Sequence, residues 1–346
     1  SPSAGWLVSI FANYAAAITN GLQITHQPNI SAGNALGALA LVGGAAGVYS
    51  QTKIVARIER GMPSLLGCSK NGSVAIVNPT AVSGEFVADD TSVWLGGPFN
   101  KNVAASTTNY VQPWVTTSSQ ATRAPASVPI PIGGTLQRFC ITTTGTQSAN
   151  NSLVATLYVN GNNATGITTT VPAGGLAGYY CDNTPTAAIT AGQDLSLELV
   201  NNANATSANI SGFAIALVQT SGTAAVLGGG SLGTLTAGTL YWIPNVTVSN
   251  ATEASARAAM PRAGTTTNLC GEISGASTSG SVVLTLYKNG SSTAATTTLA
   301  GGATGITCSS SFSPVSWAQG DTMSLEVVQN ACGGTCATVS GWSVDY

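Results

Sequence analysis

The chain has 346 residues, of which only 22 are charged: 10 are Lys or Arg and 12 are Asp or Glu. An ordinary soluble chain of this length carries about 86 charged residues. Ten cations cannot neutralise a run of phosphates, so the composition excludes a nucleic-acid partner. A hydrophobic content of 44% excludes intrinsic disorder. The formal net charge of −2 gives little repulsion between molecules, which favours self-association.

The N-terminal segment is the most apolar part of the chain. Residues 1–52 contain no Lys, Arg, Asp or Glu, and in water such a stretch aggregates unless it packs against this subunit or a neighbour. We therefore predict a charge-free N-terminal assembly region. The apolar run 32–49 is long enough to raise the question of a membrane span, but Asn34 and five glycines make it a poor one. We predict a buried or interface segment and no membrane span.

Residues 53–109 give weaker signals. The first charges come together between residues 53 and 60, where the spacing fits a helix face and a strand equally well. Strand-like runs at 74–77 and 84–87 favour a divergent β domain. Asp89-Asp90 is the one adjacent carboxylate pair, and calcium binding and a turn both fit it. We favour the turn because no loop of spaced oxygen ligands surrounds the pair.

From about Tyr110 the chain repeats itself. Residues 121–140 align without a gap to residues 251–270, and the later landmarks keep an offset of 127 to 130. These landmarks are Tyr-x-Asn-Gly, Ser-Leu-Glu and Ser-Gly-aromatic. The sequence therefore predicts two copies of one domain in tandem. The predicted organisation is an N-terminal part at 1–109, a first repeat at 110–218, a Gly- and Thr-rich linker at 219–240 and a second repeat at 241–346.

Each copy is predicted to be all-β. Segments 154–159 and 282–288 are rich in β-branched and aromatic residues and end in Asn-Gly, a strong hairpin signal. Segments 194–200 and 321–328 alternate polar and apolar residues. Short strands at intervals of about ten residues are typical of a sandwich or jelly roll. We expect tandem jelly-roll or β-sandwich domains.

Seven cysteines indicate the compartment. Because the repeat preserves the spacing of two pairs, we predict disulfides Cys140–Cys181 and Cys270–Cys308. Cys332 and Cys336 are expected to bridge a tight hairpin, which leaves Cys68 over. The alternative is seven buried free thiols. Disulfides imply an oxidising location, and we expect a virion or extracellular protein.

The sequence gives no support for catalysis, and we expect no enzyme, cofactor or metal site. The single His26 lies in an uncharged segment without the context of a nucleophile elbow. Residues 228–233 (GGGSLG) match G-x-G-x-x-G, but the segment that follows is a poor helix, so we assign them to the linker. Glu198 and Glu326 hold equivalent positions in the two copies, which favours an outward-facing sheet position over a catalytic pair.

Two tryptophans near the domain starts, Trp114 and Trp242, are the candidates for glycan binding, together with Tyr241. Exposed aromatic rings make sugar-binding platforms, and host surface glycans are then the implied partner. The alternative, which we favour, is that these rings anchor the core of a sandwich.

The repeated motifs also carry a resemblance. A Gly-Gly-Thr-Leu turn at 133–136, a strand ending in Tyr-x-Asn-Gly, and an Asp-bearing turn leading into Ser-Leu-Glu resemble a β-sandwich module of tailed-bacteriophage and environmental viral structural proteins. The cysteine pair departs from the simplest form of that pattern. The resemblance covers the two repeats and implies a virion surface role, as a capsid, decoration, spike or fibre component.

Our first hypothesis is therefore a viral structural protein that assembles through residues 1–52, with copies of itself and other particle subunits as partners. An extracellular filament or sheath subunit of a cell, whose N-terminal arm donates a strand to the next subunit, is the second. A carbohydrate-binding surface adhesin is the third.

Overall fold

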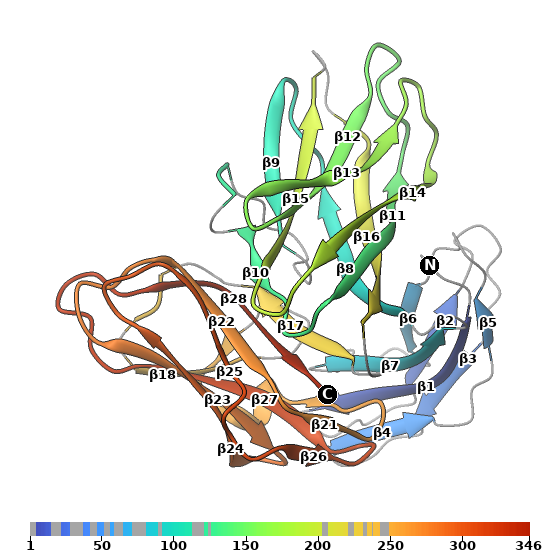
Figure 1. Ribbon diagram of the computed structural model, residues 1–346. Helices are drawn as coiled ribbons and strands as arrows, with labels where there is room; N and C mark the ends of the chain where they lie inside the picture. The colour runs from blue at the N-terminus through green and yellow to red at the C-terminus, as the bar shows by residue number, and fades with distance from the viewer. Residues whose placement is uncertain are drawn as a thin grey trace.

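The fold was analysed in a computed structural model. It describes residues 5–14, 22–27, 37–41, 47–51, 56–58, 65–70, 81–88, 92–112, 121–123, 126–202, 207–220, 225–230, 234–236, 238–242 and 249–346. Up to residue 88 only the course of the strands is described. The described residues form β-strands and a single short 3-10 helix, η2 (Glu253–Ala256). The prediction of an all-β protein is therefore confirmed, and Figure 1 shows its strands in three groups.

The N-terminal group (blue in Figure 1) contains β1 (Gly5–Tyr14), β2 (Leu22–Gln27), β3 (Gly37–Leu41), β4 (Gly47–Gln51), β5 (Ala56–Ile58), β6 (Leu65–Lys70) and β7 (Ala81–Ala88). Strand β1 pairs with β4 and β5 along one edge and with β7 along the other. Strands β3, β2 and β6 make a second small sheet. The predicted strand at 84–87 falls within β7, whereas 74–77 lies outside the described residues.

The second group is a sandwich of two antiparallel sheets. Its strands are β8 (Ser92–Lys101), β9 (Thr107–Val111), β10 (Val128–Pro129), β11 (Gly134–Thr144), β12 (Leu153–Val159), β13 (Asn162–Val171), β14 (Gly178–Ile189), β15 (Asp194–Asn201) and β16 (Asn209–Gln219). One sheet has the order β14-β11-β16-β8. The other has the order β10-β15-β12-β13, with β9 also pairing β15.

The third group repeats this arrangement. Its strands are β17 (Val226–Gly230), β18 (Gly238–Trp242), β19 (Ser249–Asn250), β20 (Ala258–Ala259), β21 (Gly264–Thr266), β22 (Leu269–Gly275), β23 (Ser281–Lys288), β24 (Ser291–Ala300), β25 (Gly305–Ser309), β26 (Val315–Trp317), β27 (Thr322–Gln329) and β28 (Thr338–Asp345). Its sheets have the orders β17-β28-β22-β25 and β19-β18-β27-β23-β24.

The two sandwiches share one topology. If the eight main strands of each are counted along the chain, one sheet contains strands 1, 8, 3 and 6 side by side and the other contains 2, 7, 4 and 5. This order, in which early strands pair with late ones, is that of a jelly roll. It also fixes the equivalence of strands between the copies, so that β9 corresponds to β18, β13 to β24 and β14 to β25.

Local sequence explains the central hairpins. In β12, alternate residues from Leu153 to Val159 are buried, as the period of a pleated strand requires. The strand ends at Asn160-Gly161, where both residues have positive φ, 49° and 75°. Asn289 and Gly290 repeat this at 52° and 84°. Two successive residues with positive φ define a type I′ turn, which matches the twist of a hairpin.

The first strand of each sandwich lies outside the range that the repeat predicts for it. Strands β8 and β9 begin the first sandwich before residue 110, and β17 begins the second inside the predicted linker 219–240. Both β8 and β17 contain Gly-Gly, a pattern typical of turns and linkers. Each pairs with the last strand of its sandwich: β8 with β16, and β17 with β28. The partner lies more than 100 residues further along the chain in both cases.

The structure contains the three predicted disulfides. Cys140 of β11 and Cys181 of β14 face each other directly in the ladder, with their Cα atoms 4.1 Å apart. Cys270 of β22 and Cys308 of β25 repeat this geometry at 4.0 Å. In each case the disulfide joins an edge strand to its only partner in the sheet among the described strands. The third disulfide, Cys332–Cys336, closes a turn, and the side chain of Cys68 is outside the description.

We expect the edge disulfides to contribute more stability than the turn disulfide. Replacing Cys140 and Cys181 by Ser should cost about 4 kcal/mol of unfolding free energy, because a long loop is released in the unfolded chain. The disulfide Cys332–Cys336 closes a loop with a sequence separation of only 4. The same replacement of these two cysteines should therefore cost less, about 2 kcal/mol. Guanidinium denaturation of both double variants measures the difference. Equal losses would contradict the loop-entropy explanation.

Candidate functional site

The residues singled out in the sequence do not converge on one place. Trp114 and Asp89-Asp90 lie outside the described residues, and His26 is described only as part of β2. Trp242 is 1% exposed and lies in the core of the second sandwich, so its ring offers no surface to a sugar. Residues 228–230 of the glycine motif form the end of β17, and 231–233 are outside the description.

Glu198 and Glu326 occupy equivalent outward positions in their sheets, each beside two tyrosines. Glu326 Oε1 accepts hydrogen bonds from the hydroxyls of Tyr241 at 3.2 Å and Tyr287 at 3.1 Å. The two rings meet edge to face at 5.6 Å. In the first sandwich, Tyr158 donates to Glu198 Oε1 at 3.2 Å. Each carboxylate is therefore held by phenol hydroxyl groups.

The tyrosines in these clusters keep their protons. Burial, followed by the hydrogen bond to Glu326 and its charge, raises the pKa of Tyr287 to about 12. Burial and the adjacent glutamate also raise the pKa of Tyr110, Tyr158 and Tyr241. Since a deprotonated phenol beside a carboxylate would add a second negative charge, the arrangement favours permanent hydrogen-bond donors over acid–base chemistry.

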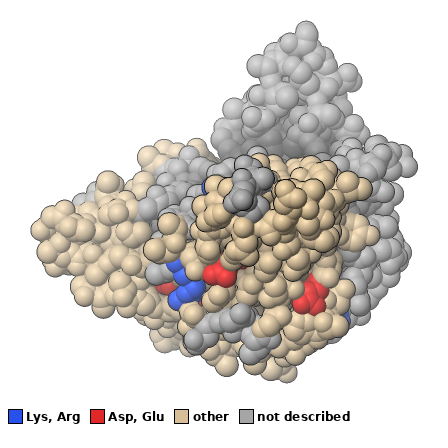
Figure 2. Space-filling model, turned by 90° about the horizontal axis from the view of Figure 1, so that it is seen from above, with Lys and Arg blue, Asp and Glu red and all other residues tan. Residues whose placement is uncertain are grey.

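Ion pairs flank these clusters. Arg123 lies 3.3 Å from Asp194, and Arg257 lies 2.5 Å from Glu253. Lys288 lies 2.9 Å from Asp321, the residue equivalent to Asp194 in the repeat. Figure 2 shows the Lys, Arg, Asp and Glu side chains described on this face as a few separate patches among uncharged residues. In each of these three pairs, opposite charges lie side by side.

The contact between the two sandwiches, which we call the junction, contains a buried carboxylate. Ser127, just before β10, donates its hydroxyl to Glu272 Oε1 of β22 at 2.6 Å. The amide of Gln112 donates to the carbonyl of Ser127 at 3.1 Å and also to the carbonyl of Ser340 in β28. These four side chains are at most 6% exposed. Polar groups from both sandwiches therefore pair with one another away from water.

Close backbone packing surrounds these bonds. Gly341 of β28 lies against β10, where a Cβ atom would stand 2.8 Å from Val128 Cγ2 and 3.2 Å from the carbonyl oxygen of Ser127. Strand β17 lies across the junction, with Val226 in the core of the first sandwich and Leu227 in that of the second. Figure 1 shows β10, β17 and β28 meeting there. The sandwiches are thus in direct contact over several strands.

Glu272 is the member of the junction whose hydrogen bonds are incomplete. Its Oε2 atom is buried and has no hydrogen-bond partner among the described residues. Burial raises the pKa of Glu272 to about 7, with a further rise from Asp194, while hydrogen bonds from Ser127 and Ser340 and the charge of Arg123 lower it. The buried Asp345, by contrast, accepts from the backbone and side chains of Thr267 and Asn268.

Sequence reasoning missed Glu272, although one signal was present. The gapless alignment of the repeats places Glu272 on Thr142, so a carboxylate stands in the second copy where the first has a neutral hydroxyl. A charge introduced at one position of an otherwise neutral strand indicates a contact that is not shared by the copies. The junction, which contains Glu272 and not Thr142, is such a contact.

Among the described residues, no group of three or more His, Cys, Asp or Glu side chains is placed to hold a metal ion. The same part of the chain contains no helix of the length and apolarity needed to cross a membrane.

Comparisons with known proteins give no family. No family model and no curated protein matches the chain. Among solved structures, it is similar to VP2 of infectious bursal disease virus in a subviral particle, at 10% identity and a TM-score of 0.24, over 99% of this chain and 66% of that one. A xanthan lyase from Paenibacillus matches at 11% identity and a TM-score of 0.22, over 97% of this chain and 32% of the lyase.

An insecticidal delta-endotoxin from Bacillus thuringiensis matches at 7% identity and a TM-score of 0.21, over 98% of this chain and 52% of the toxin. TM-scores at this level carry no argument about fold or function. The fold and the function are therefore inferred from the residues of this chain.

Glu272 predicts a pH-dependent stability. The folded protein holds the Glu272 proton up to about pH 7, whereas the unfolded chain releases it near pH 4.5. Stability should therefore fall as pH rises between these values, by about 3 kcal/mol in all, and stay level above them. Glu272→Gln should flatten this slope in urea denaturation between pH 4.5 and pH 8. Glu326→Gln, the control, should leave the slope in place, and an unchanged slope in Glu272→Gln would contradict the assignment.

Gly341 predicts a steric test of the junction. Gly341→Ala should cost about 1–3 kcal/mol, because the new methyl group collides with Val128 and forces β10 away from β28. Hydrogen exchange should show weaker protection at residues 126–130. Gly178→Ala is the matched control, since the nearest atom to a Cβ there is 4.0 Å away. Equal protection in the two variants would mean that the sandwiches are not held by this contact.

Proposed function

We propose that the chain is a structural protein of a virus particle, a capsid, decoration, spike or fibre component, and that it is not an enzyme. The observation that carries the proposal is the pair of jelly rolls, each with an internal disulfide at a sheet edge, joined through a buried junction. Such a unit is stiff and covalently reinforced. Its carboxylates Glu198, Glu326 and Glu272 are each held by hydroxyl groups of the same chain.

The composition supports assembly as the task. A chain with 22 charges in 346 residues has little electrostatic repulsion to keep copies apart. The repeated sandwiches present Ser- and Thr-rich strands at their edges, as in β24, in which six of the ten residues are Ser or Thr. Such neutral edges pack against similar surfaces without the cost of burying charge. The disulfides support a virion or extracellular location.

The phage-type module remains a prediction from the repeated motifs. The alternative function, an extracellular filament or sheath subunit, relied on an N-terminal arm that donates a strand. In the structure β1 is paired along both of its edges within its own chain. Donation of β1 would require that sheet to open first, which favours the particle subunit.

Removal of residues 1–52 tests the proposal. The full chain, purified under oxidising conditions, should form regular particles or polymers in electron microscopy and sediment as a large species. The truncated chain should stay small while it keeps the Cys140–Cys181 and Cys270–Cys308 disulfides, which non-reducing mass spectrometry reports. A full chain that stays monomeric at high concentration, or a truncated chain that still assembles, would contradict the proposal.

A further inference from the structure

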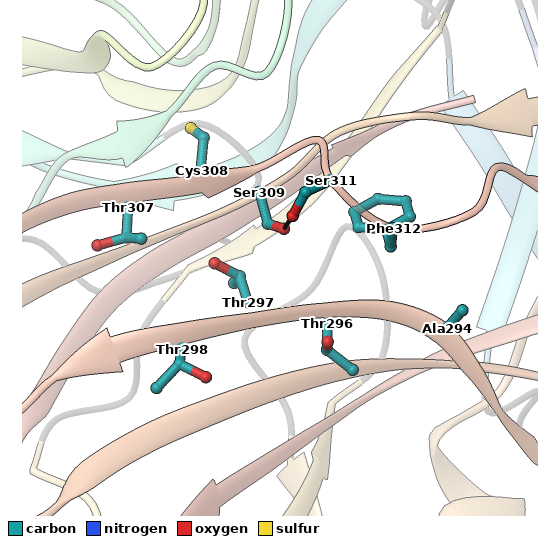
Figure 3. Close-up of a pocket in the computed structure, with 9 residues that line it drawn as sticks. All are labelled: Ala294, Thr296, Thr297, Thr298, Thr307, Cys308, Ser309, Ser311 and Phe312. Atoms are coloured by element: carbon teal, nitrogen blue, oxygen red, sulfur yellow. Dashed lines mark hydrogen bonds between the residues drawn. The ribbon is translucent and has the colours of Figure 1, made fainter.

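A groove of about 460 Å³ runs along the second sandwich between β24 and β25. Its walls carry hydroxyl groups from both strands and from the segment after β25, together with the ring of Phe312. Figure 3 shows Ser309 and Ser311 side by side, joined by a hydrogen bond of 3.5 Å, with Phe312 next to them. None of the described residues that line the groove is charged.

One buried hydroxyl in this groove lacks a partner. Thr297 is 3% exposed, and its Oγ1 atom has no hydrogen-bond partner within the described part of the chain. In Figure 3 its side chain projects from β24 toward the strand that carries Ser309. Leaving such a group unpaired costs free energy, so a buried orphan hydroxyl beside open space indicates a missing acceptor or donor.

The first sandwich provides an internal comparison. Thr169 pairs with Ala155, and Thr297 pairs with Leu284, the residue equivalent to Ala155, so the two threonines occupy the same position of the fold. Thr169 is 2% exposed and donates to the carbonyl of Phe139 at 2.8 Å. The same position is therefore satisfied internally in one copy and left open to the groove in the other.

The edge strands also differ between the two copies. In the first sandwich, β14 runs unbroken for 12 residues and pairs with an equally continuous β11. In the second, the corresponding strands are divided into β25 and β26 and into β21 and β22. The segment between β25 and β26 carries Ser311 and Phe312 into the groove wall. The Cys270–Cys308 disulfide ties β25 to β22 and fixes that wall.

From this arrangement we propose that the groove between β24 and β25 is a binding site for a neutral saccharide. Hydroxyl side chains both donate and accept hydrogen bonds, as sugar hydroxyls do, so the two sets can pair in either direction. A half-buried aromatic ring beside them offers an apolar surface. Since the described lining holds no charge, an anionic ligand such as a sialylated or sulfated glycan finds no counter-charge. The volume falls in the range of small-ligand sites.

Saturation-transfer difference NMR on the full chain tests the site, with chitobiose, lactose and maltotriose as neutral probes and 3′-sialyllactose as the charged one. At least one neutral probe should bind, and the charged probe should bind no better than lactose. Thr297→Val removes the orphan hydroxyl at nearly constant shape, and Ser311→Ala removes a second hydroxyl. Each should weaken binding at least tenfold, while the thermal midpoint of Thr297→Val stays equal to or above that of the parent.

Thr169→Val is the matched control. It removes the equivalent hydroxyl from the first sandwich, where the hydrogen bond to Phe139 is lost, so the thermal midpoint should fall while saccharide binding is unchanged. The proposal would be overturned if no neutral probe binds at 10 mM, about the weakest affinity that such a site needs, or if binding survives both groove variants. It would also be overturned if Thr297→Val alters only self-association in sedimentation, because the groove would then bind a second copy of the chain.

Discussion

The arrangement of the two sandwiches depends on the buried contact between them, in which Ser127 donates a hydrogen bond to Glu272 and β10 packs against β28. A carboxylate at such a contact must be either paired or neutral. Here one oxygen accepts the bond from Ser127 and the other has no partner among the described residues, and burial raises the pKa of Glu272 to about 7. The stability of this contact is thus expected to depend on pH, whereas the internal folds of the sandwiches depend on apolar packing and disulfides.

The repeat made much of the fold predictable. Alternation in β12 and β15, the Asn-Gly turns and the paired cysteines are local signals, and duplication doubled each of them. Strands β8 and β17 were not predicted. Both contain Gly-Gly, and each is defined as a strand by its pairing with the last strand of its sandwich. Long-range pairing of that kind leaves no local pattern, so the boundaries of the two sandwiches were the part that sequence could not define.

The candidate sites were less predictable, for a different reason. Trp242 was singled out as an aromatic residue near a domain start, but burial decides whether a ring packs or binds, and burial depends on partners far along the chain. Glu272 and Thr297 stand out because each has a buried side-chain oxygen without a hydrogen-bond partner among the described residues. An unpaired oxygen has no signature in a sequence, although comparison of each residue with its counterpart, Thr142 or Thr169, marks where the copies have diverged.

The edge disulfides have a consequence for how copies of this chain can meet. An exposed edge strand invites exchange, in which one molecule inserts its strand in place of its neighbour's. Cys181 and Cys308 fasten β14 and β25 to their own sheets, so those strands cannot be displaced while the disulfides are intact. Subunits that meet at these edges can add to one another without domain swapping. Each subunit then keeps the same fold when it joins an assembly and when it dissociates. Under reducing conditions the disulfides are lost, and the edge strands become free to exchange between subunits.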